Sequence, residues 1–378
     1  MSDRPKVMVT FGTRPEAIKM FPVVHALRAD GRFDVKVAVT AQHREMLDQV
    51  LAIAGITPDI DLDLMQHGQS LDALASRILL SFGQVLDGEK PDRVLVHGDT
   101  LTTMMVTLSC YFRKIPIGHV EAGLRSGDIY SPWPEEVNRR VTGTIADLHF
   151  APTQTAADAL LAENTSQDDV FVTGNTVIDA LLATKAKLKA DPALGQTIDT
   201  ALADVENKRL IAVTAHRREN FGEGMRNIAA ALKTLAGRED VAIVYPVHPN
   251  PNVAGVMKEQ LGAMENIHLI DPLDYPNFVR MMMRADLILT DSGGIQEEAP
   301  SLGKPVLVMR DTTERPEGIA AGTALLVGAD CGAIVEQALR LLDDPDSYAK
   351  VAQAHNPYGD GSAAQRITEL IAARHRLS

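Results

Sequence analysis

This sequence has few cysteines and no long apolar run. Its two cysteines, Cys110 and Cys331, lie far apart without metal-ligand spacing, so we interpret both as structural. No window reaches the uninterrupted apolar length of a membrane span. The first residues run directly into a strand, without a cleavable signal segment. The sequence therefore predicts a cytoplasmic protein that has no contact with a membrane.

Positive charge is also scarce. The formal net charge is −13, and such a chain repels nucleic acids and anionic membrane surfaces at long range. Neither is expected as a partner. An anionic ligand would have to be held by local basic residues, which makes each arginine or lysine beside a glycine turn informative.

Two nucleotide-binding fingerprints are missing as well. No Gly-x-Gly-x-x-Gly follows a predicted strand, which disfavours a nicotinamide cofactor. The phosphate-binding loop of NTPases is also missing. The sequence therefore predicts neither a dinucleotide cofactor nor an ATPase-type site.

The sequence does contain a repeated alternation of apolar strands and amphipathic helices. The first series places strands at residues 6–11, 35–40, 93–97, 116–120, 149–151 and 170–173. After an Ala-, Lys- and Asp-rich stretch at 182–208, a second series places strands at 210–214, 241–247, 267–270, 287–290, 305–309 and 325–327. Such alternation indicates two Rossmann-like α/β domains with doubly wound parallel sheets.

One stretch organises the second half. Residues 290–300, Thr-Asp-Ser-Gly-Gly-Ile-Gln-Glu-Glu-Ala-Pro, follow a short apolar strand, and a helix is predicted over 295–302. The two glycines would let the backbone approach a phosphate at the helix N-terminus. The two glutamates would repel that phosphate, unless one of them reaches the hydroxyl groups of a ribose. An ordinary tight turn followed by helix-start acids explains the stretch equally well.

Polar clusters also follow the predicted strands of the first half. Arg14 and Lys19 follow the first strand and offer two cations at a helix start. Asp99 and Glu121 follow the third and fourth strands at equivalent positions, which would bring two carboxylates to one rim of the sheet. Asp99 could instead cap the next helix. Glu135 follows a proline-stiffened loop and opens another helix, where acids are common.

The second half adds basic residues. His216 is followed by two arginines after a strand, a pattern more typical of a ligand contact than of a structural histidine. The loop at 245–250 looks structural. Arg315, behind another strand, could reach an anion held by the two glycines. Carboxylates, basic residues and a diphosphate cradle without a metal triad indicate acid/base chemistry on a nucleotide sugar. The residues alone leave the reaction open.

The same segments resemble the bacterial non-hydrolysing UDP-N-acetylglucosamine 2-epimerases. The shared motifs occur in order at residues 11–19, 41–44, 97–100, 119–125, 131–138, 173–176, 216–219, 290–303, 310–317 and 355–361. So many ordered motifs are far more specific than any one of them. The resemblance implies two Rossmann-like domains in the GT-B glycosyltransferase arrangement, with a site in the cleft between them. The first domain would comprise residues 1–180 with the final helix, 363–378, and the second residues 181–362.

The resemblance also implies a reaction, the reversible inversion of UDP-N-acetylglucosamine at C2 to UDP-N-acetylmannosamine for cell-envelope polysaccharide synthesis. It implies a homodimer that needs no cofactor and no metal. No adjacent carbonyl acidifies the C2 proton, so the family expels UDP from C1 while a base removes that proton, and then adds both back with the proton on the other face. Carried over by motif, the catalytic residues are Asp99, Glu121, Glu135 and His216. The substrate-binding residues are Arg14, Lys19, Asp99, Glu121, His216, Leu273, Phe278, Ser292, Gly293, Gly294, Glu298 and Arg315.

Three other functions compete with this one. A hydrolysing epimerase would release N-acetylmannosamine and UDP, a GT-B glycosyltransferase would need an acceptor pocket, and a non-catalytic nucleotide-sugar binder would not need the acids. Asp99 and Glu121 favour epimerisation over the last two. Some family members bind a second substrate molecule as an activator through an Ala-Gln-His-Arg-Gln segment and a later arginine. This chain has Glu45 and Gly68 at the differing positions, which weakens the expectation of activation by substrate.

Overall fold

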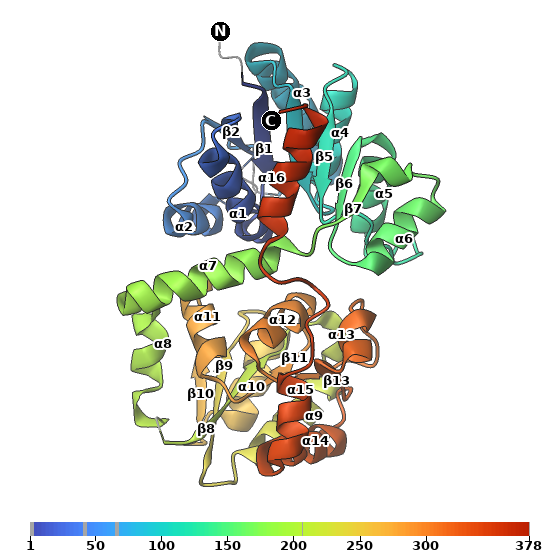
Figure 1. The fold of residues 1–378 in the computed structure, drawn as a ribbon. Helices are drawn as coiled ribbons and strands as arrows, with labels where there is room; N and C mark the ends of the chain where they lie inside the picture. Colours follow the sequence, from blue (N-terminus) through green and yellow to red (C-terminus); the bar gives the residue numbers. More distant parts are fainter. Residues whose placement is uncertain (1–3, 41–43, 65–67, 206, 378) are drawn as a thin grey trace. The chain divides into compact units, whose positions relative to one another are not determined.

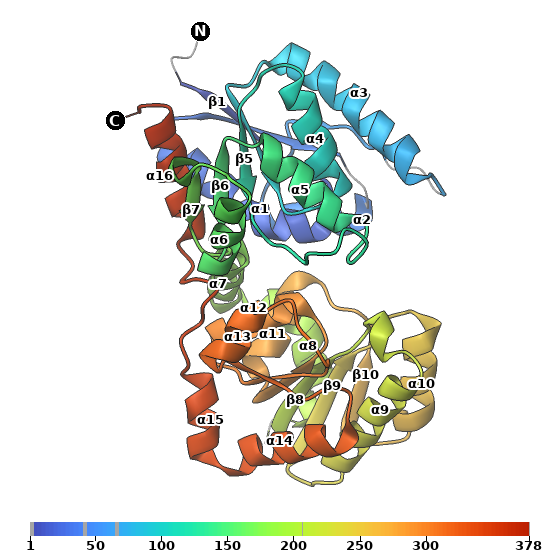
Figure 2. The same ribbon diagram turned by 90° about the vertical axis from the view of Figure 1, so that its right-hand side faces the viewer.

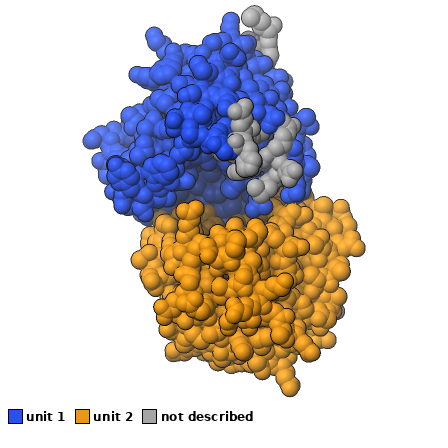
Figure 3. All heavy atoms as spheres, turned by 180° about the vertical axis from the view of Figure 1, so that it is seen from behind, with its two compact units in different colours: residues 1–180, 358–378 blue, residues 181–357 orange. Residues whose placement is uncertain are grey.

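The computed structural model describes residues 4–40, 44–64, 68–205 and 207–377. Residues 41–43, part of the segment on which the expectation about substrate activation rests, lie outside this set. The chain forms two compact units, residues 1–180 with 358–378 and residues 181–357, which Figure 3 distinguishes by colour. In the described part of the chain, no helix is long and apolar enough to cross a membrane.

The first unit is built on a parallel sheet of seven strands in the order β3-β2-β1-β4-β5-β6-β7. The strands are β1 (Lys6–Phe11), β2 (Asp34–Val39), β3 (Ile60–Asp61), β4 (Arg93–His97), β5 (Ile117–Val120), β6 (Leu148–Ala151) and β7 (Val170–Val172). Val9 of β1 pairs with Val37 of β2 on one side and with Leu95 of β4 on the other. The strand order reverses between β1 and β4, so the loops that follow them are neighbours at the carboxyl edge, where sheets of this kind bind ligands.

Helices cover both faces of this sheet (Figure 1 and Figure 2). Helix α1 (Arg14–Asp30) contacts α2 (Arg44–Ala54) and the last helix, α16 (Ala363–Arg374). On the other face, α3 (Leu71–Glu89), α4 (Leu101–Tyr111) and α5 (Glu135–Ile145) pack side by side. The short elements α6 (Gln154–Ala162) and η1 (Gln167–Asp169) precede β7. The start of α16 is fixed because the Ala364 backbone N–H donates to the Asp179 carboxylate at 2.8 Å.

The second unit contains a parallel sheet of six strands in the order β10-β9-β8-β11-β12-β13. The strands are β8 (Arg209–Thr214), β9 (Val241–Pro246), β10 (Ile267–Ile270), β11 (Leu287–Thr290), β12 (Val306–Val308) and β13 (Ala324–Leu326). The helical elements are α7 (Thr176–Ala190), which crosses the unit boundary, η2 (Pro192–Gly195), α8 (Gln196–Ala201), η3 (Ala203–Val205), η4 (Arg218–Asn220), α9 (Glu223–Leu235), α10 (Pro251–Leu261), α11 (Tyr275–Arg284), α12 (Gly293–Glu298), η5 (Ala299–Leu302), α13 (Pro316–Ala321), α14 (Cys331–Asp343) and α15 (Pro345–Ala352).

Both faces of the second sheet are buried, which explains why its strands are nearly continuous apolar runs. Successive side chains of a strand point to opposite faces. Ile211 and Val213 of β8 therefore join a core formed with α9, α10 and α14. Leu210 and Ala212 join a second core formed with α7, α8 and α11. The four residues are at most 4% exposed, so β8 lies at the centre of the unit.

The prediction of two Rossmann-like α/β domains with parallel sheets is confirmed. One local prediction needs correction. The helix expected over 295–302 is divided into α12 and η5, and α12 already begins at Gly293. The two glycines therefore form the first turn of the helix instead of the turn that precedes it. Pro300 lies in η5, and a proline there cannot donate the backbone hydrogen bond that would continue α12.

Candidate functional site

A buried carboxylate links the loops after β1 and β4. Thr13 is the N-cap of α1, and Glu16, three residues on, completes a capping box. The Oε2 atom of Glu16 accepts hydrogen bonds from the backbone N–H groups of Gly12 at 3.0 Å and Thr13 at 2.8 Å. Its Oε1 atom accepts the hydroxyl of Thr100 at 2.8 Å. Glu16 thus holds together the two loops that carry Arg14, which is half-buried, and Asp99.

Asp99 is not a helix cap. Thr100 is the N-cap of α4, and its hydroxyl accepts the Thr103 backbone N–H. The Asp99 carboxylate instead lies 3.1 Å from an Arg139 nitrogen, and its backbone carbonyl accepts the Asn138 side chain at 2.9 Å. Desolvation raises the pKa of Asp99; Arg139 opposes this shift and Glu121 adds to it. A carboxyl in this setting exchanges protons more readily near neutral pH than an ordinary aspartate.

Glu121 is held in a strained backbone conformation beside a lysine. Its φ of 59° lies in the left-handed region, which costs a non-glycine residue about 1–3 kcal/mol. The Lys19 ammonium forms an ion pair with its carboxylate, which is 9% exposed. The His97 Nε2 atom is 3.5 Å from the same carboxylate. Lys19, which the family resemblance assigns to substrate binding, therefore neutralises a predicted catalytic acid in this structure.

The two glutamates that open α5 have different surroundings. Glu136 is fully buried and accepts the backbone N–H of Ser126 at 3.0 Å and the guanidinium of Arg140 at 2.9 Å. Burial opposes ionisation of Glu136, but these hydrogen bonds outweigh it and lower its pKa. Glu135 is only half-buried, and within the described residues its carboxylate forms no hydrogen bond. Glu136 therefore has a structural role, whereas Glu135 is available to a ligand.

In the second unit, a buried aspartate holds the loop that carries His216. Asp291, fully buried at the end of β11, accepts the backbone N–H groups of His216 and Arg217, each at 2.9 Å. The His216 side chain is 40% exposed, and its ring stacks on that of His248 at 5.5 Å and 19°. Desolvation lowers the pKa of His216; Asp291 opposes this, whereas His248 and Arg217 add to it.

The loop at 245–250 is therefore more than the structural connection expected from its sequence. Tyr245 does have a structural role, because its hydroxyl donates to the Ala215 carbonyl at 2.5 Å. Three residues later, His248 reaches the ring of His216. No local sequence signal marks this contact, since the two histidines follow different strands and meet only when β8 and β9 pair.

Ser292, Gly293 and Gly294 border an open space beside a guanidinium. Neither glycine has a positive φ, so the backbone conformation does not require glycine. A Cβ added at Gly293 would meet only Arg217 Nη2, at 3.8 Å, and one at Gly294 only Glu298 Oε1, also at 3.8 Å. The fold itself would accept a side chain here. Glycine therefore keeps the space over this turn free, with the cation of Arg217, a residue outside our predicted site, on one side.

The glutamates of α12 have separate partners. The Glu297 side chain is 2% exposed and forms an ion pair with Arg315, whose Nε atom contacts its carboxylate. Glu298 is 7% exposed and accepts the Tyr275 hydroxyl at 2.8 Å. The predicted uracil contacts, Leu273 and Phe278, are half-buried against the core beside α11. The repulsion between these glutamates and a bound phosphate, which the sequence led us to expect, is thus reduced, since Arg315 neutralises Glu297.

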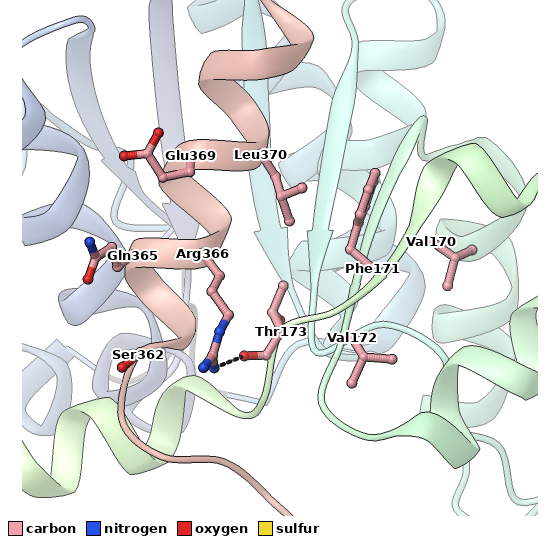
Figure 4. A pocket seen from close by; sticks show the side chains of 9 residues that line it. All are labelled: Val170, Phe171, Val172, Thr173, Ser362, Gln365, Arg366, Glu369 and Leu370. Carbon is pink, nitrogen blue, oxygen red and sulfur yellow. Dashed lines mark hydrogen bonds between the residues drawn. The ribbon is translucent and has the colours of Figure 1, made fainter.

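A surface groove of about 630 Å³ lies elsewhere in the first unit, between the edge strand β7 and α16 (Figure 4). Arg366 crosses it and donates to the Thr173 carbonyl at 3.0 Å. It contains none of the predicted site residues. In the part of the chain that the structure describes, no group of three or more His, Cys, Asp or Glu residues could hold a metal ion.

Comparison with known proteins identifies the family of this chain. The family model for UDP-N-acetylglucosamine 2-epimerase matches residues 25–372. The chain belongs to this family. The UDP-N-acetylglucosamine 2-epimerase of Escherichia coli K12 is 55% identical over 97% of this chain and 98% of that protein. The Bacillus subtilis enzyme is 53% identical over 97% of this chain and 94% of its own length. The family predicted from the sequence motifs is confirmed.

Solved structures of the epimerase family share the fold. The Neisseria meningitidis UDP-GlcNAc 2-epimerase, bound to UDP-GlcNAc, has a TM-score of 0.90 and 49% identity, and the match covers 97% of this chain and 100% of that one. The Methanocaldococcus jannaschii enzyme, in complex with UDP-GlcNAc and UDP, has a TM-score of 0.81 and 31% identity, over 97% and 99% of the two chains. Members of the family therefore keep this architecture across a wide range of identity.

Proposed function

We propose that this epimerase interconverts UDP-N-acetylglucosamine and UDP-N-acetylmannosamine by eliminating UDP and adding it back. Family membership supports the substrate. The observation that carries the proposal is the pair of carboxylates at the ends of adjacent strands, each beside a cation: Asp99 with Arg139 and Glu121 with Lys19. Two ionisable groups with different surroundings suit a reaction that removes a proton on one face and returns it on the other.

The chemistry requires both halves of the reaction to occur in one site. A base takes the C2 proton as the C1–oxygen bond to UDP breaks, which leaves a glycal and UDP, whose terminal phosphate gains the electron pair of that bond and a second negative charge. Return of UDP to C1 and of a proton to the opposite face of C2 gives the epimer. Asp99, Glu121, Glu135 and His216 are the proposed proton donors and acceptors. Cations close to Asp99 and Glu121 would limit the cost of moving charge between them.

UDP binding is proposed for the second unit. Ser292, Gly293 and Gly294 would hold the diphosphate over the open turn, with Arg217 supplying positive charge. Glu298 would accept the ribose hydroxyls, and Leu273 and Phe278 would contact the uracil. His216 and Arg315 belong to the same proposed set, as do Arg14 and Lys19 of the first unit. The proposal is supported by the space that both glycines leave open, since UDP must remain bound after its bond to the sugar has broken.

Isotope exchange tests this function directly. The protein is incubated with UDP-N-acetylglucosamine in deuterated water, and the products are identified by NMR and mass spectrometry. We expect deuterium at C2 in a mixture of both UDP-sugars. A C2 proton that does not exchange would overturn the proposal. Release of free N-acetylmannosamine together with UDP would instead show that the enzyme hydrolyses its substrate.

A further inference from the structure

Among the residues that the structure describes, the carboxylate of Asp291 accepts hydrogen bonds from a single loop, the one that carries His216. Its Oδ2 atom accepts the backbone N–H groups of His216 and Arg217 and, at 3.1 Å, the side-chain amide of Asn220. Its Oδ1 atom shares the His216 N–H at 3.1 Å and lies 3.7 Å from the Nδ1 atom of the same residue. Asn220 also donates to the Met309 carbonyl at 3.1 Å, which ties the loop to the strand beyond β11.

A negative charge in this place needs an explanation. Asp291 is fully buried, and removing a carboxylate from water is expensive unless a cation compensates it. Within the described residues, Asp291 forms no ion pair with a lysine or an arginine, and the ring of His216 lies 3.7 Å from its carboxylate. The N–H donors stabilise the ionised carboxylate. Its charge also lies beside the imidazole, since Oδ1 is 3.7 Å from the Nδ1 atom of His216.

We propose that Asp291 is a positioning residue for His216, which fixes the loop under the imidazole and orients the ring with its Nδ1 side toward the carboxylate. The proposal rests on the proposed function of His216 in proton transfer. With Nδ1 toward Asp291, the Nε2 atom is left to face a substrate. The groups that face His216 are Asp291, which favours the charged ring, and His248 and Arg217, which disfavour it. Asp291 thus keeps the histidine able to carry a proton in a desolvated, cationic setting.

The substitution Asp291→Asn separates the charge from the anchoring. The amide oxygen can occupy the place of Oδ2 and keep the three donors, while the charge is lost. We expect kcat to fall at least tenfold and KM for UDP-N-acetylglucosamine to stay within about threefold. The arm of the kcat–pH profile that belongs to His216 should move to lower pH. An NMR titration of the His216 ring signal, identified by its loss in His216→Gln, should shift in the same direction.

Asp286→Asn is the matched control. Asp286 precedes the same strand at its other end and accepts the Leu210 backbone N–H at 2.8 Å, so the substitution removes the same charge from a carboxylate with a similar hydrogen bond, at the opposite end of the strand from Asp291. We expect the control to keep kcat and the His216 titration of the wild type. An Asp291→Asn protein that also keeps both would overturn the proposal.

If Asp291→Asn does not fold, a milder variant can test the same proposal. Asn220→Ala removes one donor to Asp291 and leaves the charge in place, so we expect kcat to fall several-fold with KM unchanged. Hydrogen exchange on the wild type then tests whether the His216 and Arg217 amides are protected. If these amides are unprotected and Asn220→Ala keeps the kcat of the wild type, the proposal is overturned. The NMR titration does not need activity. If the wild type has no epimerase activity, the proposed function is wrong. If its His216 titration nevertheless changes in Asp291→Asn, the contact between Asp291 and His216 is still established.

Discussion

The two units carry the same strand order at their centres but place different side chains on the loops that meet there. In the first, the loops after β1 and β4 are joined by Glu16, and the acids beyond them contact cations. In the second, the equivalent loops after β8 and β11 are joined by Asp291, but the turn presents glycines, backbone N–H groups and a guanidinium. A common topology therefore fixes where the loops meet, and the proposed division between proton transfer in one unit and anion binding in the other rests on their side chains.

The glycines show the same contrast. A Cβ at Gly12, after β1, would lie 2.2 Å from the hydroxyl of Thr40 and 2.6 Å from that of Thr102. This glycine is required by packing. Gly293 and Gly294 meet nothing closer than 3.8 Å, so the packing of the second unit does not require glycine at these positions.

The largest expected effect comes from Asp99→Asn, which should affect the first unit only. Loss of a general acid or base removes about 10²–10⁴-fold of rate, so we expect kcat to fall about 10³-fold while UDP binds as in the wild type. Calorimetry with UDP and a coupled assay measure the two quantities. Asp158→Asn, on the exposed face of α6, is the control and should change neither. Retained turnover in Asp99→Asn would remove this residue from the catalytic group.

Glu16→Gln should give the next largest effect. The amide keeps one acceptor oxygen but cannot accept all three donors from Gly12, Thr13 and Thr100. We expect kcat to fall about 30-fold and the free energy of unfolding to fall by about 1–3 kcal/mol. Urea denaturation and steady-state kinetics measure these changes. Normal kinetics with reduced stability would show that Glu16 supports the fold without positioning Asp99.

A pair of glycine substitutions tests the contrast between the units. Gly12→Ala should destabilise the protein by about 1–3 kcal/mol, because its methyl group has no room. Gly293→Ala should keep the melting temperature and weaken UDP binding about tenfold, because its methyl group enters the proposed phosphate space. Thermal denaturation and UDP titration on both variants give the answer. Equal UDP affinity in Gly293→Ala and the wild type would contradict the proposed cradle.

The smallest expected effect is the change in the free energy of unfolding with pH. His119 in β5 is fully buried, and burial lowers its pKa to about 3, well below the value of about 6.5 in an unfolded chain. Between these values only the unfolded state binds the proton, so stability is complete above pH 6.5 and falls as the pH drops toward 3. His119 alone should remove about 1.4 kcal/mol of unfolding free energy per pH unit between pH 6 and 4. Urea denaturation should show a shallower slope in His119→Gln, and an unchanged slope would contradict the assignment.

Much of the fold could be predicted because its signals are local. The apolar run at 287–289 is buried on both sides in a parallel sheet, and the polar residues directly after such runs stand at the sheet's carboxyl edge. The order of strands could not be seen, and the pairings in the site depend on it. Lys19 meets Glu121 because β1, β4 and β5 are neighbours. Three further contacts could not be seen in the sequence for the same reason. They are the contacts of His248 with His216, of Arg315 with Glu297 and of Arg217 with the space beside Gly293.

The separation of the contacting residues has a consequence for folding. The hydrogen bond from Thr100 to Glu16 joins residues 84 positions apart, and the ion pair of Lys19 with Glu121 spans 102 positions. Closing such long stretches of chain has an entropic cost that is recovered only when the strands between them pair. The acid cluster can therefore form only late, with the sheet itself. A nascent or truncated first unit that stops before β5 would lack Glu121 and Arg139, so neither ion pair of the acid cluster could form.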